Sequence, residues 1–204
     1  MEDNILKKYI GKLICGVDEV GRGPLAGPVV ACAVVMGDVK IDGVKDSKKL
    51  SAKKRDILNK EIVKKAKAIG IGVVDEKVID RINIKQATRL AMKLAVENLK
   101  DKEGNTFKPD VIMVDAETID TQIEQVSLIK GDDLIYEISC ASIVAKVLRD
   151  SYFIELDKKY PGYDFINNKG YGTQKHREAL KKLGPTPIHR ITFLKKILGE
   201  KVEN

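Results

Sequence analysis

The chain has 204 residues, 43% of them hydrophobic, and its 37 lysines and arginines exceed its 30 aspartates and glutamates to give a formal charge of +7. This size and composition predict one globular domain, and the charge favours a polyanionic partner, although lysines on solvated helix faces would give the same excess. There is no apolar run of the roughly 20 residues that a membrane span needs, no signal-peptide segment and no CxxC pair among Cys15, Cys32 and Cys140, so a cytoplasmic protein without disulfides is expected.

The order of apolar runs and helical periodicities predicts strands that alternate with helices. The predicted elements in chain order are strands at 13–17 and 28–36, a helix from a Ser51 cap to about Ala68, a strand at 69–74, a helix around 84–95, a strand at 111–114, and helices at about 139–156 and 192–198. This alternation predicts an α/β domain with an at least partly parallel sheet. We expect one domain over 1–204, in which roughly 155–204 form a helical extension.

Two of the predicted strands are followed by acids. Asp18 and Glu19 come after the strand 13–17, and Asp115 comes after the strand 111–114. Ligands in open α/β sheets bind at the carboxyl ends of strands, so these acids share a site if the two strands are neighbours. Side chains alternate in a regular strand, so Asp18 and Glu19 serve one site only if the strand ends or kinks at Glu19. The alternative is that each aspartate simply begins a turn.

A third position of interest is Asp150, in the predicted helix 139–156. It falls on one helical face with Ile143, Val147 and Ile154, which we expect to be buried. A buried carboxylate must neutralise, pair with a cation or bind a metal. Arg149 points about 100° away around the helix and is not the expected partner. A buried salt bridge to another arginine is the alternative to a metal.

Together these acids suggest a metal-dependent nuclease. Clustered carboxylates repel each other unless divalent cations compensate them, and oxygen ligands favour Mg²⁺ or Mn²⁺. With two histidines and no paired cysteines, zinc is not expected. A pair of such ions is the usual apparatus for phosphodiester hydrolysis. The predicted catalytic and metal-binding residues are Asp18, Glu19, Asp115 and Asp150.

Motifs along nearly the whole chain resemble those of type 2 ribonuclease H, the ribonuclease HII family. The matching stretches are DEVGRGPLAGPVV from Asp18, DSKKL at 46–50, INIKQAT at 82–88, VD at 114–115, KGD at 130–132, ISCASIVAKVLRD at 138–150, GYGTQKH at 170–176 and GPTPIHR at 184–190. The resemblance implies an RNase H-like fold, with a central mixed sheet flanked by helices and a C-terminal helical extension that binds substrate. It also implies the same four acids.

The resemblance further implies an endonuclease with two metal ions. Expected substrates are RNA–DNA hybrids and duplex DNA that contains single ribonucleotides. In the latter the enzyme would cut on the 5′ side, leaving 3′-hydroxyl and 5′-phosphate ends, in a pathway that removes ribonucleotides from DNA. The enzyme is expected to act as a monomer, away from membranes.

Substrate contacts are implied for three further motifs. The two glycines of the Gly-Arg-Gly motif have no side chains, so their backbone can come close enough to hydrogen-bond a 2′-hydroxyl, and the arginine between them can bind a phosphate. The tyrosine is suited to pack on the deoxyribose that follows the ribonucleotide. The residues concerned are Gly21, Arg22 and Gly23 for the glycine motif, Ser47, Lys48 and Lys49 for nearby phosphates, and Tyr171 for the sugar. The alternative for Tyr171 is an aromatic residue that merely belongs to a turn, and the alternative for the lysines is that they are solvated. His176 and His189 are expected to be structural.

Other classes of protein remain open at this point. Another nuclease with the RNase H fold, such as a Holliday-junction resolvase or a transposase-like core, would not require a ribose 2′-hydroxyl. A nucleic-acid-binding domain without catalysis would gain nothing from four acids that face phosphate. Ribonuclease HIII is disfavoured because only about a dozen residues precede the first predicted strand. Glu117, close to Asp115, is a hypothetical influence on metal preference.

Overall fold

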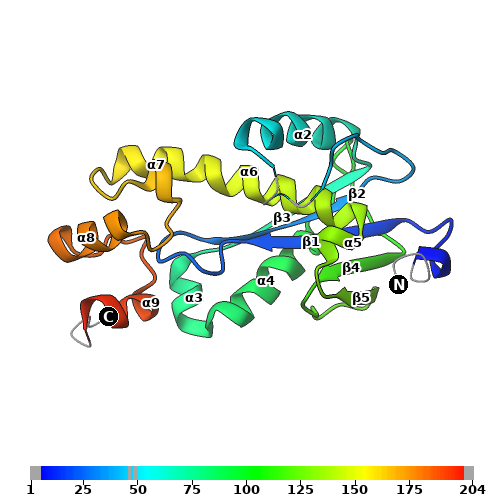
Figure 1. Cartoon of the computed structure of the whole chain (residues 1–204). Coiled ribbons are helices and arrows are strands. Elements are labelled where there is room, and N and C mark those ends of the chain that lie inside the picture. Colours follow the sequence, from blue (N-terminus) through cyan, green and yellow to red (C-terminus); the bar gives the residue numbers. More distant parts are fainter. Residues whose placement is uncertain (1–5, 46, 48–49, 200–204) are drawn as a thin grey trace.

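The computed structural model describes residues 6–45, 47 and 50–199, which form a five-stranded sheet between two layers of helices (Figure 1). The named elements in chain order are β1 (Ile14–Val20), β2 (Val29–Val35), α2 (Ala52–Lys65), β3 (Ala68–Val74), α3 (Glu76–Ile82), α4 (Ile84–Glu97), β4 (Val111–Asp115), β5 (Glu124–Leu128), α5 (Gly131–Leu134), α6 (Tyr136–Lys159), α7 (Phe165–Asn168), α8 (Gln174–Leu183) and α9 (Ile191–Leu198).

The sheet is mixed, as expected, with the strand order β3-β2-β1-β4-β5. The strands β1, β2 and β3 pair antiparallel, whereas β4 is parallel to β1 and β5 is parallel to β4. The helices α2 and α6 cover one face of the sheet, and α3 and α4 cover the other (Figure 1). The two strands that carry Asp18 and Asp115 are therefore neighbours, which confirms the condition for a shared site.

Glycines in the strands let the helices pack unusually close to the sheet. A Cβ atom on Gly16 of β1 would lie 2.1 Å from the backbone carbon of Glu137 in α6. On the other face, Cβ atoms on Gly70 and Gly72 of β3 would lie 2.0 and 1.9 Å from backbone oxygens of α4. The facing side of α4 is itself lined by buried alanines at positions 87, 91 and 95. Small side chains on both partners thus set the thickness of the core.

The C-terminal part forms a helical lobe beyond one end of the sheet. The long helix α6 runs past the sheet, and its last turns pack with α7, α8 and α9 (Figure 1). This lobe has an apolar core of its own, which includes Phe153, Phe165 and Leu180. Asp80 of α3 accepts hydrogen bonds from the backbone N–H groups of residues 191 and 192, so α9 is tied to the sheet domain. A helical extension was predicted here, and its role in binding substrate stays a prediction.

Several elements were not predicted from the sequence. The edge strand β5 reads Glu-Gln-Val-Ser-Leu, and it is partly exposed, so it lacks the apolar run of a buried strand. The helices α5 and α7 have four residues each, too few to show a periodicity. Asn83, with φ of 67°, ends α3 and caps α4 with its side chain, which divides the helical stretch in two. The predicted Ser51 cap of α2 is confirmed.

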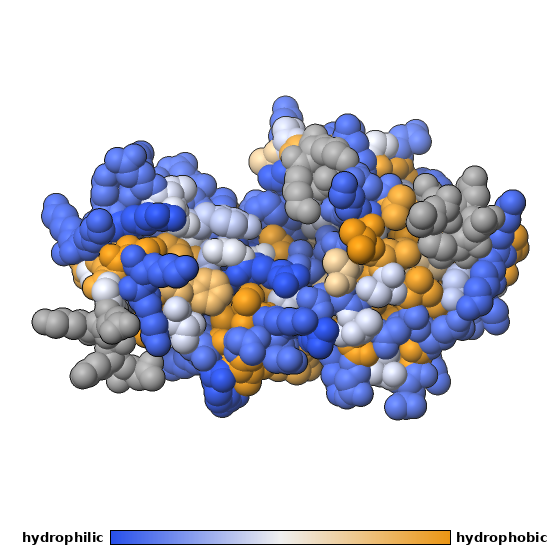
Figure 2. Space-filling model, turned by 60° about the horizontal axis from the view of Figure 1, so that its bottom comes forward, coloured by the Kyte–Doolittle hydropathy of each residue, from blue (hydrophilic) through white to orange (hydrophobic). Residues whose placement is uncertain are grey.

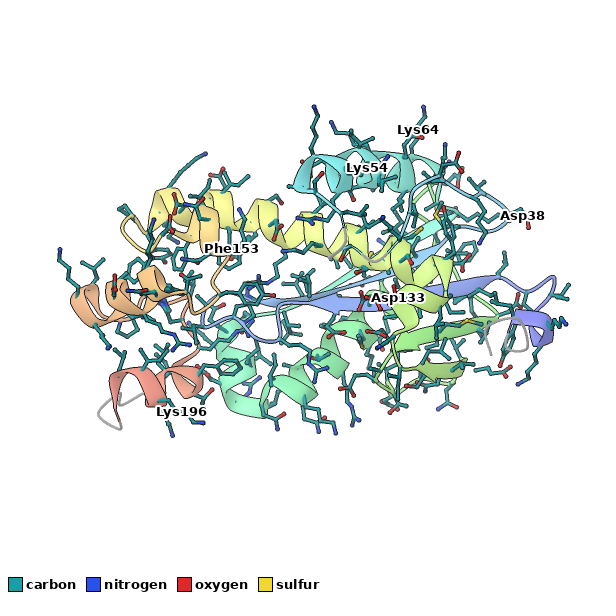
Figure 3. All side chains as sticks on the ribbon, in the orientation of Figure 1. Asp38, Lys54, Lys64, Asp133, Phe153 and Lys196 are labelled. Carbon is teal, nitrogen blue, oxygen red and sulfur yellow. The ribbon has the colours of Figure 1, made fainter. Side chains whose placement is uncertain are left out.

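One face of the surface shows how polar and apolar side chains are distributed. Figure 2 shows a face on which hydrophilic side chains surround separate hydrophobic patches. In Figure 3, Lys64 of α2 and Lys196 of α9 extend away from the body of the protein. Within the described ranges, none of the helices has the length and hydropathy needed to cross a membrane.

The substitution Gly16→Ala is expected to lower the free energy of unfolding by at least about 3 kcal/mol, because the new Cβ overlaps the backbone of α6. Urea denaturation would measure the change. Gly23→Ala is the matched control, since its Cβ would meet only an ordinary contact at 3.7 Å from Tyr171. Equal stabilities for the two variants would contradict the close packing of β1 on α6.

Candidate active site

Asp18 and Asp115 lie side by side on adjacent parallel strands, with Asp115 at the end of β4 and Asp18 two residues before the end of β1. The register pairs Val17 with Val114, so the two aspartates follow in the next position. Gly16 contacts α6, and Asp18, two residues further on, faces the same side of the sheet. The backbone N–H of Gly131 donates to Asp115 Oδ1 at 2.7 Å. The predicted pairing of these two acids is confirmed in the structure.

Glu19 reaches the same edge from the other face of the sheet. The expectation that the strand ends or kinks at Glu19 is wrong, because β1 continues to Val20 and Glu19 pairs with Ala31 of β2. However, β4 stops at Asp115, so Glu19 stands beyond the end of the neighbouring strand. The backbone N–H of Glu19 donates to Asp18 Oδ1 at 2.7 Å. Glu19 can therefore reach the site because the neighbouring strand β4 ends before it, and not because β1 itself ends at Glu19.

Burial and mutual repulsion make this acid cluster unfavourable when all its members are ionised. Burial, followed by the charge of Glu19, raises the pKa of Asp18 well above its usual value, and Asp115 adds to the effect. Burial raises the pKa of Glu19 from 4.5 to about 7, against an opposing effect of Arg22, and Asp115 raises it further. Such a site favours a proton or a bound cation.

The donor set fits a divalent cation that takes oxygen ligands. Asp18, Glu19 and Asp115 supply only carboxylate oxygens, which Mg²⁺ and Mn²⁺ prefer. Among the residues that the structure describes, no group of three or more histidine, cysteine, aspartate or glutamate side chains is already arranged to hold an ion. The support for a metal is thus electrostatic and chemical: burial and neighbouring carboxylates raise the pKa of both Asp18 and Glu19, and Asp115 contributes to each shift.

Asp150 is in different surroundings from the other three predicted acids. The helical face on which it was placed is buried only at its start: Ile143 is fully buried, but Ile154 is 42% exposed, and Arg149 is buried at the level of Asp150. The Asp150 carboxylate is paired with Lys146 Nζ at 2.6 Å and with Arg55 Nη2 at 3.8 Å. An arginine is thus among the observed partners, but the ion pairs are partly exposed and not buried as the alternative had it. The carboxylates that raise the pKa of Asp18 are Glu19 and Asp115, and those that raise the pKa of Glu19 are Asp115 and Glu117.

The structure brings a different acid, Asp132, close to Asp115. Asp132 is buried in α5, directly after Gly131, whose N–H group binds the Asp115 carboxylate. Figure 3 labels the next residue, Asp133, near the middle of the sheet between α5 and β1. Sequence reasoning had quoted the KGD motif without giving Asp132 a role. The available signal was the position of Asp132 in the KGD motif, 17 positions after Asp115, which is too weak to use alone.

Two buried arginines shape the glycine motif, and neither role was predicted from the sequence. Arg190 donates to the backbone oxygens of Gly21, Arg22, Pro24 and Gly27 at 2.6–3.0 Å. Arg149 donates to the backbone oxygens of residues 26, 28 and 169 at 3.0–3.2 Å. Gly21 has φ of 99°, and a Cβ there would lie 2.3 Å from Arg149 Nε. The first glycine is thus required by both backbone conformation and space.

Arg22 is held by acids in this structure. Its Nη1 lies 3.7 Å from Glu19 Oε1 and 3.5 Å from Glu117 Oε1. The buried Glu117 also accepts from Arg89 Nε at 3.0 Å. Glu117 therefore links Arg22 to α4 and gives it an anchor other than Glu19. An influence of Glu117 on metal preference stays a prediction.

The remaining predicted contact residues lie on either side of this turn. Tyr171 is 41% exposed, and its Cε1 is the atom nearest to a Cβ built on Gly23. Ser47 is buried, and its hydroxyl lies 2.8 Å from that of Ser142 in α6, so its side chain faces the protein interior and not a phosphate. Lys48 and Lys49 lie outside the described residues. His176 and His189 are buried, in agreement with a structural role.

Comparison with known proteins identifies the family. The sequence profile described as ribonuclease HII matches residues 15–196. The chain belongs to the ribonuclease HII family. It is 59% identical over 182 residues to the ribonuclease HII of Alkaliphilus oremlandii, covering 89% of this chain and 90% of that protein. As a ribonuclease HII, the protein is a nuclease of the hydrolase class with ribonuclease H activity on RNA–DNA hybrids.

Solved ribonuclease HII structures share the fold. The ribonuclease H2 of Pyrococcus horikoshii superposes with a TM-score of 0.75 at 27% identity, over 94% of this chain and 99% of that one. The ribonuclease HII of Archaeoglobus fulgidus, solved in complex with PCNA, superposes with a TM-score of 0.71 at 26% identity, over 87% and 93% of the two chains. The predicted RNase H-like α/β fold is confirmed.

The raised pKa of Glu19 predicts how pH changes the stability of metal-free ribonuclease HII. A carboxyl group whose pKa rises on folding favours the folded state when protonated, so stability falls as pH rises from about 4.5 to about 7. Glu19→Gln removes this loss. At pH 8 in EDTA we expect the variant to melt several degrees above the wild type, at about 2–4 °C for each kcal/mol.

The control for this measurement is the same comparison at pH 4, where Glu19 is protonated in both folded and unfolded chains and the two melting temperatures should agree. Addition of Mg²⁺ at pH 8 should stabilise the wild type more than Glu19→Gln. A variant that is less stable than the wild type at pH 8 without metal would contradict the electrostatic account of the site.

Proposed function

We propose that this ribonuclease HII cuts duplex DNA on the 5′ side of a single embedded ribonucleotide, as well as RNA in RNA–DNA hybrids, and leaves 3′-hydroxyl and 5′-phosphate ends. The observation that carries the proposal is the position of Tyr171 against Gly23, in the turn that directly follows Asp18 and Glu19. A sugar-sized aromatic surface and a bare backbone thus stand next to the acid cluster.

The proposed metal ligands are Asp18, Glu19 and Asp115, and we add Asp132 as the fourth acid in preference to Asp150. The burial of Asp132 next to Gly131, the residue bound to Asp115, supports this choice, and the ion pairs of Asp150 argue against the original one. When bound, two Mg²⁺ or Mn²⁺ ions supply Lewis acidity that activates water and stabilises the leaving 3′-oxygen.

The residues of the glycine turn would recognise the ribonucleotide. Arg149 and Arg190 hold the carbonyl oxygens of the turn inside the protein, which keeps its backbone in one conformation. We expect the backbone at Gly21 and Gly23 to approach the 2′-hydroxyl, the group that distinguishes RNA from DNA. Arg22 would leave Glu19 for a neighbouring phosphate, while Glu117 keeps hold of its guanidinium. The Tyr171 ring would pack on the next deoxyribose.

We also propose a compartment, an oligomeric state and a biological role for the protein. Free, buried cysteines at positions 15, 32 and 140 suit a reducing cytoplasm. A net charge of +7 suits a nucleic-acid substrate, and the proposed role is the removal of ribonucleotides from DNA by a monomeric enzyme. Complex formation with PCNA is a property of the Archaeoglobus fulgidus relative.

A cleavage assay tests the proposed substrate. With Mg²⁺, duplex DNA carrying one ribonucleotide should receive a single cut on its 5′ side, and all-DNA duplex should stay intact. Asp18→Asn should abolish the cut, and Tyr171→Ala should weaken it by about tenfold or more, since misplacement at a reacting centre is costly. Cleavage of long hybrids alone would overturn the single-ribonucleotide proposal, and cleavage of all-DNA substrate would favour another nuclease of the same fold.

A pair of substitutions separates the two candidates for the fourth acid. Asp132→Asn should lower kcat by about 100-fold or more, because it removes negative charge beside Asp115. Asp150→Asn should retain most activity and lose at most about 1 kcal/mol of stability, since a partly exposed ion pair contributes little. Asp133→Asn, one residue along α5 and exposed, is the matched control. Full activity of Asp132→Asn with loss in Asp150→Asn would restore the original assignment.

A further inference from the structure

Two buried histidines meet in the C-terminal lobe, far from any role in the chemistry proposed above. His176 lies in the first turn of α8 and His189 lies just before α9, and their Nε2 atoms are 3.0 Å apart. Both side chains are almost fully buried, and the rings of Tyr163 and Phe165 pack around them at centroid distances of 5.2–6.3 Å. This apolar wall excludes water from the contact between the rings.

The hydrogen bonds at the outer ends of the pair allow one arrangement of protons. The backbone N–H of Thr186 lies 2.8 Å from His189 Nδ1, and the Thr186 hydroxyl lies at the same distance. The hydroxyl can donate or accept, but a backbone N–H can only donate, so its bond requires a lone pair on His189 Nδ1. The proton of a neutral His189 is then on Nε2, from which it donates to His176 Nε2. The proton of His176 is consequently on Nδ1, which donates to the backbone oxygen of Tyr171 at 2.9 Å.

This arrangement requires both rings to be neutral. A second proton on His189 would point at the N–H of Thr186, and a second proton on His176 would point at the N–H of His189. Burial, followed by the proximity of His176, lowers the pKa of His189 to about 4, and burial also lowers the pKa of His176. At neutral pH the pair is therefore a continuous chain of directed hydrogen bonds from Thr186 to Tyr171.

The end of this chain is the residue that contacts the glycine turn. The Tyr171 oxygen that receives the His176 proton also accepts from the N–H of Thr173, while the Tyr171 N–H is bonded to Asn168. At the other end, His189 pairs with Ala26 through an isolated antiparallel bridge, and the N–H of Gly27 donates to Ile188. The two histidines thus connect the backbone of Tyr171 to the segment that lies against the glycine turn.

We propose that His176 and His189 are positioning residues which, as two neutral rings of opposite tautomer, set the place of the Tyr171 ring relative to Gly23 and so the preference for a single-ribonucleotide junction over a long hybrid. The consequence for selectivity rests on the function proposed for Tyr171. The tautomers follow from the hydrogen bonds alone and can be tested separately.

The tautomers are tested first, on the wild-type protein labelled with ¹⁵N histidine. Long-range ¹H–¹⁵N spectra at pH 7 distinguish a ring protonated on Nδ1 from one protonated on Nε2. We expect one histidine of each kind, with His176 carrying its proton on Nδ1, and no cationic ring. The same tautomer on both residues, or a charged ring, would overturn the proposal.

Selectivity is tested by the ratio of kcat/KM for a single-ribonucleotide duplex to that for a long hybrid. His176→Asn and His189→Asn each keep a group for the outer bond and lose the contact between the rings, and both should lower the ratio toward that of Tyr171→Ala, by about tenfold. Tyr163→Phe is the matched control: it removes the hydrogen bond to the Gly184 oxygen in the same lobe, without touching the chain of bonds, and should leave the ratio unchanged.

The outcomes separate the two levels of the proposal. A histidine variant that melts no lower than Tyr163→Phe yet keeps the wild-type ratio would overturn the positioning role. If Tyr171→Ala itself keeps the wild-type ratio, the function proposed for Tyr171 fails and the effect on selectivity fails with it, whereas the tautomer spectra still decide whether the directed pair exists. If the histidine variants unfold, those spectra of the wild type carry the test.

Discussion

The architecture of the site depends on two positive charges that are buried against backbone oxygens. Arg149 and Arg190 are both fully buried, and their hydrogen bonds go to the carbonyl groups of the turn between β1 and β2 and of the loop before Tyr171. Burial lowers the pKa of Arg149 to about 10 and that of Arg190 to about 9, so both stay charged at neutral pH. A buried guanidinium needs all of these partners, which fixes segments from distant parts of the chain together.

This fixed turn stands next to a cluster of acids in which burial and neighbouring carboxylates make full ionisation unfavourable. Asp18, Glu19 and Asp115 are placed by the pairing of β1 with β4, and their proximity raises the pKa of the first two. The hydrophobic faces of the sheet outweigh this cost, because strands β1 and β4 are buried by helices along most of their length. The cost of burying these carboxylates next to each other therefore falls at a site where a bound cation would reduce it.

The C-terminal lobe contributes to the site mainly by positioning the loop that carries Tyr171, and less by its charges. Phe153 of α6, labelled in Figure 3, would collide with a side chain at Gly27 or at Gly170, so it packs between the glycine turn and the loop that carries Tyr171. Polar groups buried in this lobe are hydrogen-bonded to each other, as in the pair His176–His189. A lobe held by a few directed contacts orients a neighbouring side chain more closely than an apolar core of the same size would.

The sequence alone determined the strands that carry apolar runs, the positions of Asp18 and Asp115 after two of them and, through its motifs, the family, because apolar runs and motif spacing are local properties of the chain. The pairing of β1 with β4, which makes the two aspartates neighbours, came from the tertiary structure. It did not determine which side of α6 is buried. Periodicity places Asp150 and Arg149 on different faces, but tertiary contacts decide that Arg149 is inside, where it meets the oxygen of Pro28, 121 residues away. Asp132 was missed since a four-residue helix has no periodicity to read. Contacts between residues so distant in sequence, such as Arg149 and Pro28, form only when the chain folds, so the local pattern of the sequence does not show them.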